Sequence, residues 1–287
     1  MLEWLFSLKK KFININIAEK PIIEVPDQEF NEGFDALNSN LLRNLSPPLG
    51  KHSDVWARPA GKFPAAYLWD SAFISQAWKI WDPTIAFKIL KPFVEFQDKD
   101  GRMPHQVFLG RFVSGLSNPP FLSWAVNEIF NFYRDKKWLE YFNSPILEFI
   151  NFRKEKRFNA TYGLYYWIDS YESGIDNTPR FRSTDESEDY GVSNLGSIDL
   201  NAEIALQFES LIKMMEDLGR KEEINTLQKN FSTLIQNIDR KLWDKDKGIF
   251  GDLDLTTGEI KTIDTIASYF PLVISNLNEE KYNQMTN

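Results

Sequence analysis

Apolar residues recur at steps of three and four in three stretches of the chain, residues 122–132, 204–215 and 224–238. This spacing puts apolar side chains on one helix face and predicts three amphipathic helices. The stripes are Leu122, Ala125, Ile129, Phe132; Ile204, Phe208, Leu211, Met215; and Ile224, Leu227, Phe231, Leu234, Ile238. Gly219 lies between the last two stretches, and glycine is favoured just past a helix end. We therefore predict an antiparallel helical hairpin there.

Start signals predict further helices. Asp27 is a good N-cap for a helix over residues 27–45, and another helix is expected over residues 69–81. Pro83 suits the first position of a helix over residues 83–97. Strand-like alternation is confined to short pieces such as GLYYWI and GIFGDLDL. About eight helices without a substantial sheet indicate an all-α fold of paired helices, and the lack of a visible short repeat disfavours a regular solenoid.

Three long segments separate the predicted helices, at residues 46–66, 99–119 and 158–198. Residues 1–26 are expected to form an extended lead-in before the domain over 27–287. Loops longer than about 15 residues are uncommon inside a compact domain and are usually functional. The pattern therefore predicts a helical scaffold that presents a site on its loops.

The charge balance and the absence of cysteine exclude several kinds of function. The net charge is -8, from 33 basic and 41 acidic residues, and no basic stripe is visible, so nucleic acid is an unexpected partner. Without cysteine there is no disulfide, Cys-zinc site or thiol nucleophile, which fits a reducing compartment. No apolar run approaches the roughly 20 residues of a membrane helix, and the start lacks the order of a signal peptide. We therefore expect a cytoplasmic protein without a membrane segment.

The motifs present favour carboxylate chemistry. His52 and His105 are the two histidines and lie far apart, which disfavours a His-based metal site or a Ser-His triad. Phosphate-loop, dinucleotide and nucleophile-elbow motifs are absent. The acidic run TDESEDY at 184–190 lacks the spacing of a calcium loop and is expected to be a solvated loop. No metal or cofactor is expected, and glycoside hydrolysis, which needs two carboxyl groups and no cofactor, is the main class left. Many of the 9 Trp, 10 Tyr and 23 Phe belong to a core, but aromatic rings also stack on sugars.

Four motifs occur in a characteristic order: PAAYLWDSAF (64–73), DGRMPHQ (100–106), SNPPFLSWAV (117–126) and ESGIDNTPR (172–180). Together they resemble the α-glycosidases of glycoside hydrolase family 63, which include α-glucosidase I and bacterial mannosylglycerate hydrolases, with trehalases as more distant relatives. The resemblance runs from about residue 50 to the end. It implies an (α/α)6 six-hairpin toroid and an inverting α-glycosidase for a small glucoside or a mannosyl- or glucosylglycerate-type substrate.

The resemblance assigns the general acid of this family to Asp176, in the last motif. A general acid must hold its proton at neutral pH, which partial burial or a nearby negative charge favours. Aromatic neighbours and Glu172 are expected to supply both. Gly174 is expected to let the backbone pass close to a sugar, and Asn177 to tether the loop.

The other motifs imply substrate-binding residues. Trp69 and Asp70 match a pair that contacts the sugar by stacking and by accepting hydroxyl hydrogens, although Asp70 could also be a helix N-cap. Asn118 stands where relatives more often have glutamine, and His105 is expected to line the pocket as a hydrogen-bonding group. Arg58 is expected to meet an anionic aglycone such as glycerate.

The resemblance also implies twelve helices and a catalytic Glu in the C-terminal part. About eight helices are predicted here, and the flanking Trp, Gly and Tyr of that Glu are absent around Glu279 and Glu280. We therefore expect an incomplete toroid: a truncated product, a fragment or half of a split enzyme, with exposed apolar flanks that favour self-association or a C-terminal partner segment. By itself such a chain is expected to be weakly active or inactive, and a non-catalytic sugar-binding remnant stays open as an alternative. A helical-toroid terpene cyclase is disfavoured because its D-x-D-D acid and Cys/His zinc site are missing.

Overall fold

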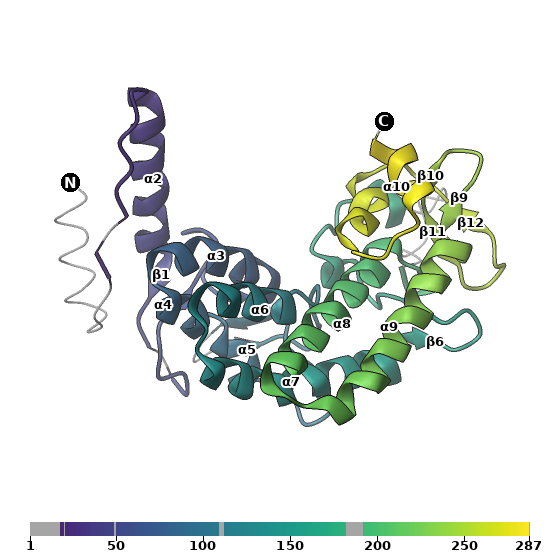
Figure 1. The fold of residues 1–287 in the computed structure, drawn as a ribbon, viewed down its shortest axis with the longest axis horizontal. Helices are drawn as coiled ribbons and strands as arrows, with labels where there is room; N and C mark the ends of the chain where they lie inside the picture. The colour runs from purple at the N-terminus through teal and green to yellow at the C-terminus, as the bar shows by residue number, and fades with distance from the viewer. Residues whose placement is uncertain (1–17, 20, 49, 109–111, 182–191, 287) are drawn as a thin grey trace.

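The computed structural model describes residues 18–19, 21–48, 50–108, 112–181 and 192–286. Figure 1 shows a curved arrangement of helices, open on one side, with the first described helix at one end and the C-terminal elements at the other. The described α-helices are α2 (Gln28–Asn44), α3 (Leu68–Trp81), α4 (Pro83–Lys88), α5 (Lys91–Glu95), α6 (Leu122–Tyr133), α7 (Lys136–Lys156), α8 (Ile198–Leu218), α9 (Lys221–Lys241) and α10 (Glu279–Thr286). The prediction of an all-α chain of paired helices is confirmed.

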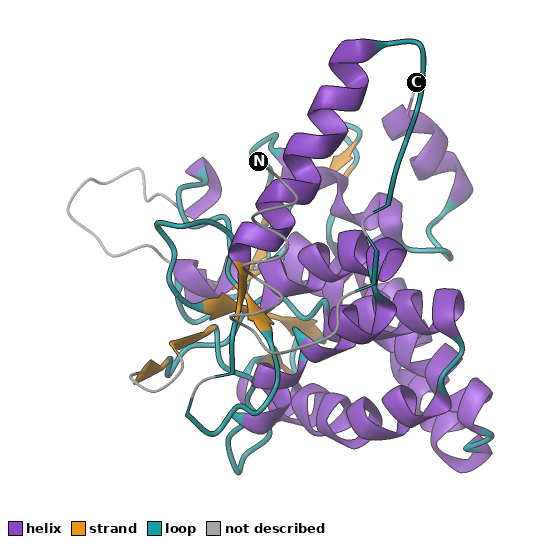
Figure 2. Ribbon diagram, turned by 90° about the vertical axis from the view of Figure 1, so that its left-hand side faces the viewer, coloured by secondary structure: helices purple, strands orange, loops and turns teal. Residues whose placement is uncertain are grey.

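Strands in the described segments are two or three residues long and pair in five small sheets. They are β1 (Leu45–Ser46), β2 (Trp56–Ala57), β3 (Ala66–Tyr67), β4 (Gln106–Phe108), β5 (Phe112–Val113), β6 (Phe158–Asn159), β7 (Leu164–Tyr165), β8 (Leu195–Gly196), β9 (Trp243–Asp244), β10 (Ile249–Phe250), β11 (Asp252–Asp254) and β12 (Ile260–Lys261). The 3-10 helices are η1 (Ser170–Ser173), η2 (Pro179–Phe181), η3 (Val192–Asn194) and η4 (Ile266–Val273). Most strands gather on one side of the molecule with the long loops (Figure 2). The expectation of no substantial sheet is confirmed.

The helix starts that local chemistry predicted are present. Asp27 caps α2 by accepting a hydrogen bond from the backbone N–H of Phe30 at 3.1 Å. The side chain of Asp82 accepts from the backbone N–H groups of Thr84 and Ile85 and so caps α4, which begins at Pro83. Both caps satisfy N–H groups that have no partner within their helix.

The single helix predicted over residues 83–97 is wrong, because the structure divides this segment into α4 and α5. Pro92 explains the break. A continuous helix would need an N–H at residue 92 and would bring the proline ring against the carbonyl of Lys88. The chain instead turns at Ile89 and Leu90, and Pro92 lies at the start of α5, where the missing N–H costs nothing.

The predicted hairpin of α8 and α9 is confirmed. Gly219 ends α8 in the left-handed conformation, with φ of 74°, and its N–H donates to the carbonyl of Glu216. The stripes of both helices are buried against each other, apart from the half-buried Ile224. In α6 the predicted stripe needs one correction, because Phe132 is 57% exposed. Phe130 is the aromatic residue of that turn that packs inward.

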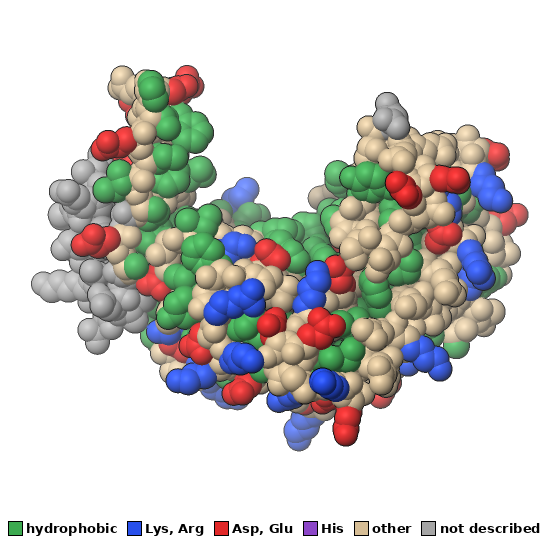
Figure 3. Space-filling view, viewed as in Figure 1, with side chains coloured by type: hydrophobic (Ala, Val, Ile, Leu, Met, Phe, Trp, Pro, Cys, Tyr) green, Lys and Arg blue, Asp and Glu red, His purple; other side chains and the backbone are tan. Residues whose placement is uncertain are grey.

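Outside the core, large apolar side chains remain exposed at positions that include Leu37, Ile80 and Ile266. Figure 3 shows hydrophobic side chains along the hollow between α2 and the C-terminal elements. The predicted self-association through such surfaces remains a prediction. Residues 18–19 and 21–26, the described part of the expected lead-in, contain neither helix nor strand. In the described segments, no helix has the length and apolar character needed to cross a bilayer.

Candidate functional site

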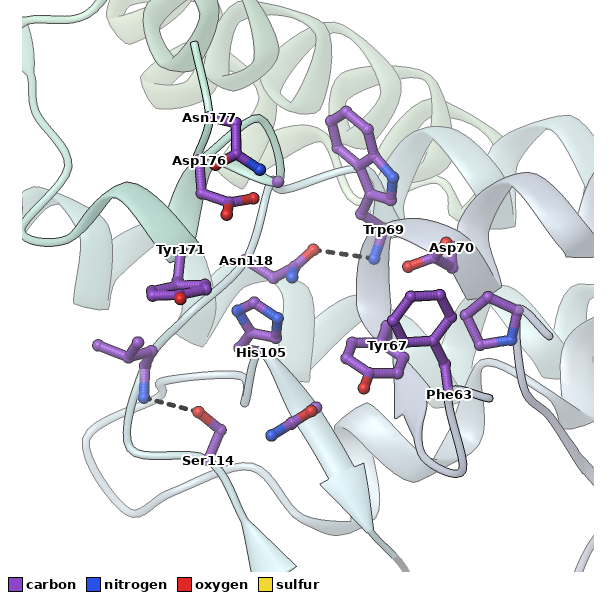
Figure 4. A pocket seen from close by; sticks show the side chains of 14 residues that line it. Phe63, Tyr67, Trp69, Asp70, His105, Ser114, Asn118, Tyr171, Asp176 and Asn177 are labelled. Carbon is purple, nitrogen blue, oxygen red and sulfur yellow. Dashed lines mark hydrogen bonds between the residues drawn. The ribbon is translucent and has the colours of Figure 1, made fainter. Parts of the chain in front are cut away.

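The three long loops meet at one end of the helices and enclose a pocket of about 600 Å³ (Figure 4). This volume falls in the range of ligand-binding clefts. The lining residues are Pro59, Phe63, Tyr67, Trp69, Asp70, His105, Gln106, Ser114, Leu116, Asn118, Tyr171, Gly174, Asp176 and Asn177. The first loop contributes two of them, the second five and the third four, and the start of α3 contributes the rest. The prediction that a helical scaffold presents a site on its loops agrees with this geometry.

The start of α3 is fixed by residues from the second loop. β3 pairs with β4, with Tyr67 opposite Gln106, and the carbonyl of His105 accepts from the backbone N–H of Leu68. Tyr67 occupies the N-cap position but makes no side-chain cap. Asn118 supplies the missing side-chain cap, because its Oδ1 accepts a hydrogen bond from the backbone N–H of Trp69 at 3.0 Å. The reading of Asp70 as an N-cap is therefore wrong, and Asp70 sits inside the first helical turn.

This arrangement leaves the Asp70 carboxyl facing the pocket (Figure 4). Burial raises the pKa of Asp70 to about 6, while its own backbone N–H opposes the rise. A carboxyl group held in this way gains from accepting hydrogen bonds from a ligand that brings hydroxyl groups into the pocket. The side chain of Trp69 lies beside it and offers an aromatic face.

Asp176 approaches the same pocket from the third loop, and its side chain is half-buried. Gly174 precedes it in the left-handed conformation, with φ of 71°. A Cβ added at Gly174 would lie 3.2 Å from the indole of Trp69. The absence of a side chain at Gly174 therefore lets the loop that carries Asp176 pack directly on Trp69. The sequence alone had suggested another reason for this glycine, a close approach of the backbone to a sugar.

The expected role of Glu172 as a substrate-binding residue needs correction. Its side chain is fully buried and does not line the pocket. Its carboxylate accepts from the guanidinium of Arg157 at 3.2 Å and from the backbone N–H groups of Ser117 and Ile168. Burial alone would raise the pKa of Glu172, but the charges of Arg153 and Arg157 hold that pKa below its ordinary value. Its negative charge is thus compensated inside the fold and stabilises the loops.

His105 lines the pocket between the two acids in Figure 4, as the sequence suggested. Its ring packs edge-on against Tyr67, with centroids 5.8 Å apart. Burial lowers the pKa of His105, against the opposing charges of Glu172 and Asp176. The neutral imidazole offers one donor and one acceptor. Its Nδ1 is buried and has no hydrogen-bond partner among the described residues.

Arg58 does not line the pocket, although its neighbour Pro59 does. The described lining contains two carboxyl groups and neither lysine nor arginine, so the expected contact of Arg58 with an anionic aglycone stays a prediction without support from the lining. The run TDESEDY lies outside the described residues.

Sequence reasoning missed several wall residues, namely Pro59, Phe63, Tyr67, Gln106, Ser114, Leu116 and Tyr171. Five of them carried a local signal. Tyr67 and Gln106 lie within motifs, and the pairing of β3 with β4 brings them together. Phe63, Leu116 and Tyr171 directly precede motifs. The others depend on how the loops close.

Comparisons with known proteins agree with this architecture. Residues 63–287 match the family described as the mannosylglycerate hydrolase MGH1-like glycoside hydrolase domain. The chain is 25% identical to Alpha-glucosidase 2 and 23% identical to Mannosyl-oligosaccharide glucosidase GCS1, both from Arabidopsis thaliana. Each alignment covers 75% of this chain but only 31% and 29% of the respective relative. The chain therefore spans about a third of the length of these relatives.

Solved structures share the fold. The GH63 mannosylglycerate hydrolase from Thermus thermophilus in complex with glucose superposes with a TM-score of 0.74 at 22% identity, over 86% of this chain and 73% of that one. Neutral trehalase Nth1 from Saccharomyces cerevisiae gives 0.67 at 12% identity, over 100% and 75%. These similarities confirm the all-α fold class of the helical-toroid glycosidases.

Proposed function

Because the chain belongs to the mannosylglycerate hydrolase MGH1-like glycoside hydrolase family, we propose that it acts in the hydrolysis of an α-glycosidic bond. The proposed substrate is a small α-glucoside or a mannosyl- or glucosylglycerate-type compound, and the proposed general acid is Asp176. One observation carries the proposal. Asp176, in the last of the four motifs, faces the same cavity as Trp69 and Asp70, in the first motif.

The proposed roles follow from the chemistry of the lining. Trp69 offers a flat apolar face to a sugar ring, and Asp70 accepts hydrogen bonds from sugar hydroxyl groups. The neutral ring of His105 adds a donor and an acceptor to the same wall. Asp176 gives its proton to the glycosidic oxygen as the bond to the anomeric carbon breaks, and a water attacks that carbon from the other face and releases its proton to a base.

The proposal assigns one of the two carboxyl groups that inversion requires. Glu279 and Glu280 are not assigned as the second, because both are exposed at the start of α10 and neither lines the pocket. The alternative of a sugar-binding protein without turnover rests on the same cavity walls.

The test is an assay of the purified chain with mannosylglycerate, glucosylglycerate and α-linked disaccharides, together with calorimetric titration by glucose. Asp176→Asn should lower turnover by about 10²–10⁴-fold, the usual contribution of a general acid, without abolishing glucose binding. Glu279→Gln, an exposed change outside the pocket, is the matched control and should leave turnover unchanged.

Turnover that survives Asp176→Asn would remove the assignment of the acid. Glucose binding without turnover of any of these substrates would favour the binding protein. Neither binding nor turnover would contradict both functions.

A further inference from the structure

Two arginines stand at the C-terminal end of α7: Arg153 in its last turn and Arg157 as its C-cap residue. Arg153 is fully buried. Its Nη2 donates to the carbonyl oxygen of Asn118 at 2.6 Å and to the hydroxyl of Ser117 at 3.1 Å. Both acceptors belong to the second long loop, so α7 holds this loop at the point where it reaches the pocket.

Arg157 holds the third loop in the same way. Its Nε and Nη2 donate to the two oxygens of Glu172, each at 3.2 Å. Glu172 also accepts from the backbone N–H of Ser117 at 2.9 Å. The two loops are therefore joined to each other as well as to α7, and none of these three charged side chains lines the pocket.

The contacts continue to the sugar-facing wall. Asn118, whose carbonyl is held by Arg153, uses its own side chain to accept from the N–H of Trp69. Trp69 in turn packs against Gly174, two residues after Glu172. The contacts therefore form a ring: α7 holds Asn118, Asn118 holds Trp69, Trp69 packs on Gly174, and α7 holds Glu172 in the same loop as Gly174. We infer that the position of the indole depends on these contacts together.

Aromatic stacking favours a guanidinium at the site of Arg153. Its Nη2 alone makes both hydrogen bonds, and Nε and Nη1 have no hydrogen-bond partner among the described residues. Its charge lies over the rings of Phe149 and Trp167, 5.2 and 5.0 Å from their centroids, which places it between aromatic faces. Burial lowers the pKa of Arg153 to about 10, so the group remains charged at neutral pH. A lysine would keep a charge, but its ammonium lacks the planar, delocalised face with which the guanidinium stacks on both rings.

We propose that Arg153 is a positioning residue for the pocket: it fixes Asn118, and through Asn118 it sets the place of Trp69 against which a sugar is bound. This inference rests on the proposed function for the identity of the ligand. The contacts that carry it do not involve the assignment of Asp176.

Fluorine NMR of fluorotryptophan-labelled protein tests the proposal directly. The Trp69 signal is identified by its loss in Trp69→Phe. In Arg153→Lys the Trp69 signal should shift and broaden, and glucose affinity should fall roughly tenfold, which corresponds to about 1.4 kcal/mol of lost contact with the displaced indole. The other tryptophans, except Trp167, which contacts Arg153, should keep their signals.

Arg180→Lys is the matched control. Arg180 is also buried and charged, but its side-chain hydrogen bonds go to Asp199 and Asp252 and not to Asn118. It should destabilise the protein without moving the Trp69 signal. Arg153→Met gives a second variant without charge; if it does not fold, Arg153→Lys decides the outcome.

An unmoved Trp69 signal in folded Arg153→Lys would overturn the proposal, and so would an equal movement in Arg180→Lys. A chain that hydrolyses no glycoside but shows the selective shift and weaker glucose binding would refute the hydrolase function and support this positioning role. Where turnover is measurable, Arg153→Lys should raise KM more than it lowers kcat, because Trp69 contacts the bound sugar and not the proton transfer.

Discussion

The α8–α9 hairpin and the pocket end of the molecule are held together by different kinds of contact. In the hairpin, stripes such as Leu211 with Met215 and Leu234 with Ile238 are buried against one another. At the pocket end, the loops are held by buried charged and amide groups, of which Glu172, Arg153 and Asn118 are the centre. The first region depends on apolar area, and the second on a few directional bonds.

This difference decides how each region responds to a change. Apolar contacts are many and each is weak, so a packed stripe loses stability in proportion to the atoms removed. A buried ion pair loses far more when one partner is removed, because the other charge stays behind without compensation. The pocket end is therefore the region where one substitution should disturb both stability and geometry.

The largest effect is expected for Glu172→Gln. The change leaves the buried guanidinium groups of Arg153 and Arg157 without their carboxylate, and the free energy of unfolding should fall by about 3–5 kcal/mol. Urea unfolding followed by circular dichroism measures this loss, and the Trp69 signal described above should move in the same variant.

Leu211→Ala in α8 supplies the comparison on the hairpin side. Leu211 is fully buried, and its truncation should cost about 2–5 kcal/mol through lost burial and a cavity. The Trp69 signal should not move. A loss below about 1 kcal/mol in Glu172→Gln, or an equal movement of Trp69 in both variants, would contradict the distinction between the two regions.

Two glycines, one in each region, allow the same comparison with smaller expected losses of stability. Gly174 and Gly219 both have positive φ, 71° and 74°, but only Gly174 would place a Cβ against another residue. Gly219→Ala should cost about 1 kcal/mol from the backbone conformation alone. Gly174→Ala should cost about 2 kcal/mol and weaken glucose binding, because the new methyl presses on Trp69. Thermal unfolding and glucose titration measure both variants, and equal effects of the two would show that the Trp69 contact is unimportant.

The smallest effect concerns the pH dependence set by Asp70. Its pKa in the folded state, about 6, is above the ordinary value of 3.8, so the folded state binds more protons between these values. The contribution of Asp70 to the free energy of unfolding should therefore fall as the pH rises from about 4 to 6, by about 1 kcal/mol once partial exposure is considered. Asp252 and Glu203, whose pKa values burial also raises, add to the total fall. Asp70→Asn should flatten this fall and be more stable than the original chain at neutral pH. Unfolding curves at both ends of this pH range measure it, and an unchanged slope in Asp70→Asn would assign the fall to another group.

Local patterns predicted the helical part of the fold well and failed where contacts from elsewhere intervene. The N-cap at Asp27 and the left-handed Gly219 depend only on neighbouring residues and were found as predicted. Pro92 was a local signal that the longer apolar pattern hid. Phe132 fits the spacing of a stripe, yet it is exposed because Phe130 fills the inner face of that turn.

The sequence by itself determined the helical hairpin and the membership of Trp69, Asp70, His105, Asn118 and Asp176 in one pocket, through periodicity and ordered motifs. Only the tertiary structure decided that Glu172 is an internal counter-charge, that Asn118 caps α3 and that Arg58 lies outside the lining. The physical reason is range. Periodicity and caps act within a few residues, whereas the partner of a buried charge or amide is chosen by whichever distant group the packed helices bring within hydrogen-bonding distance.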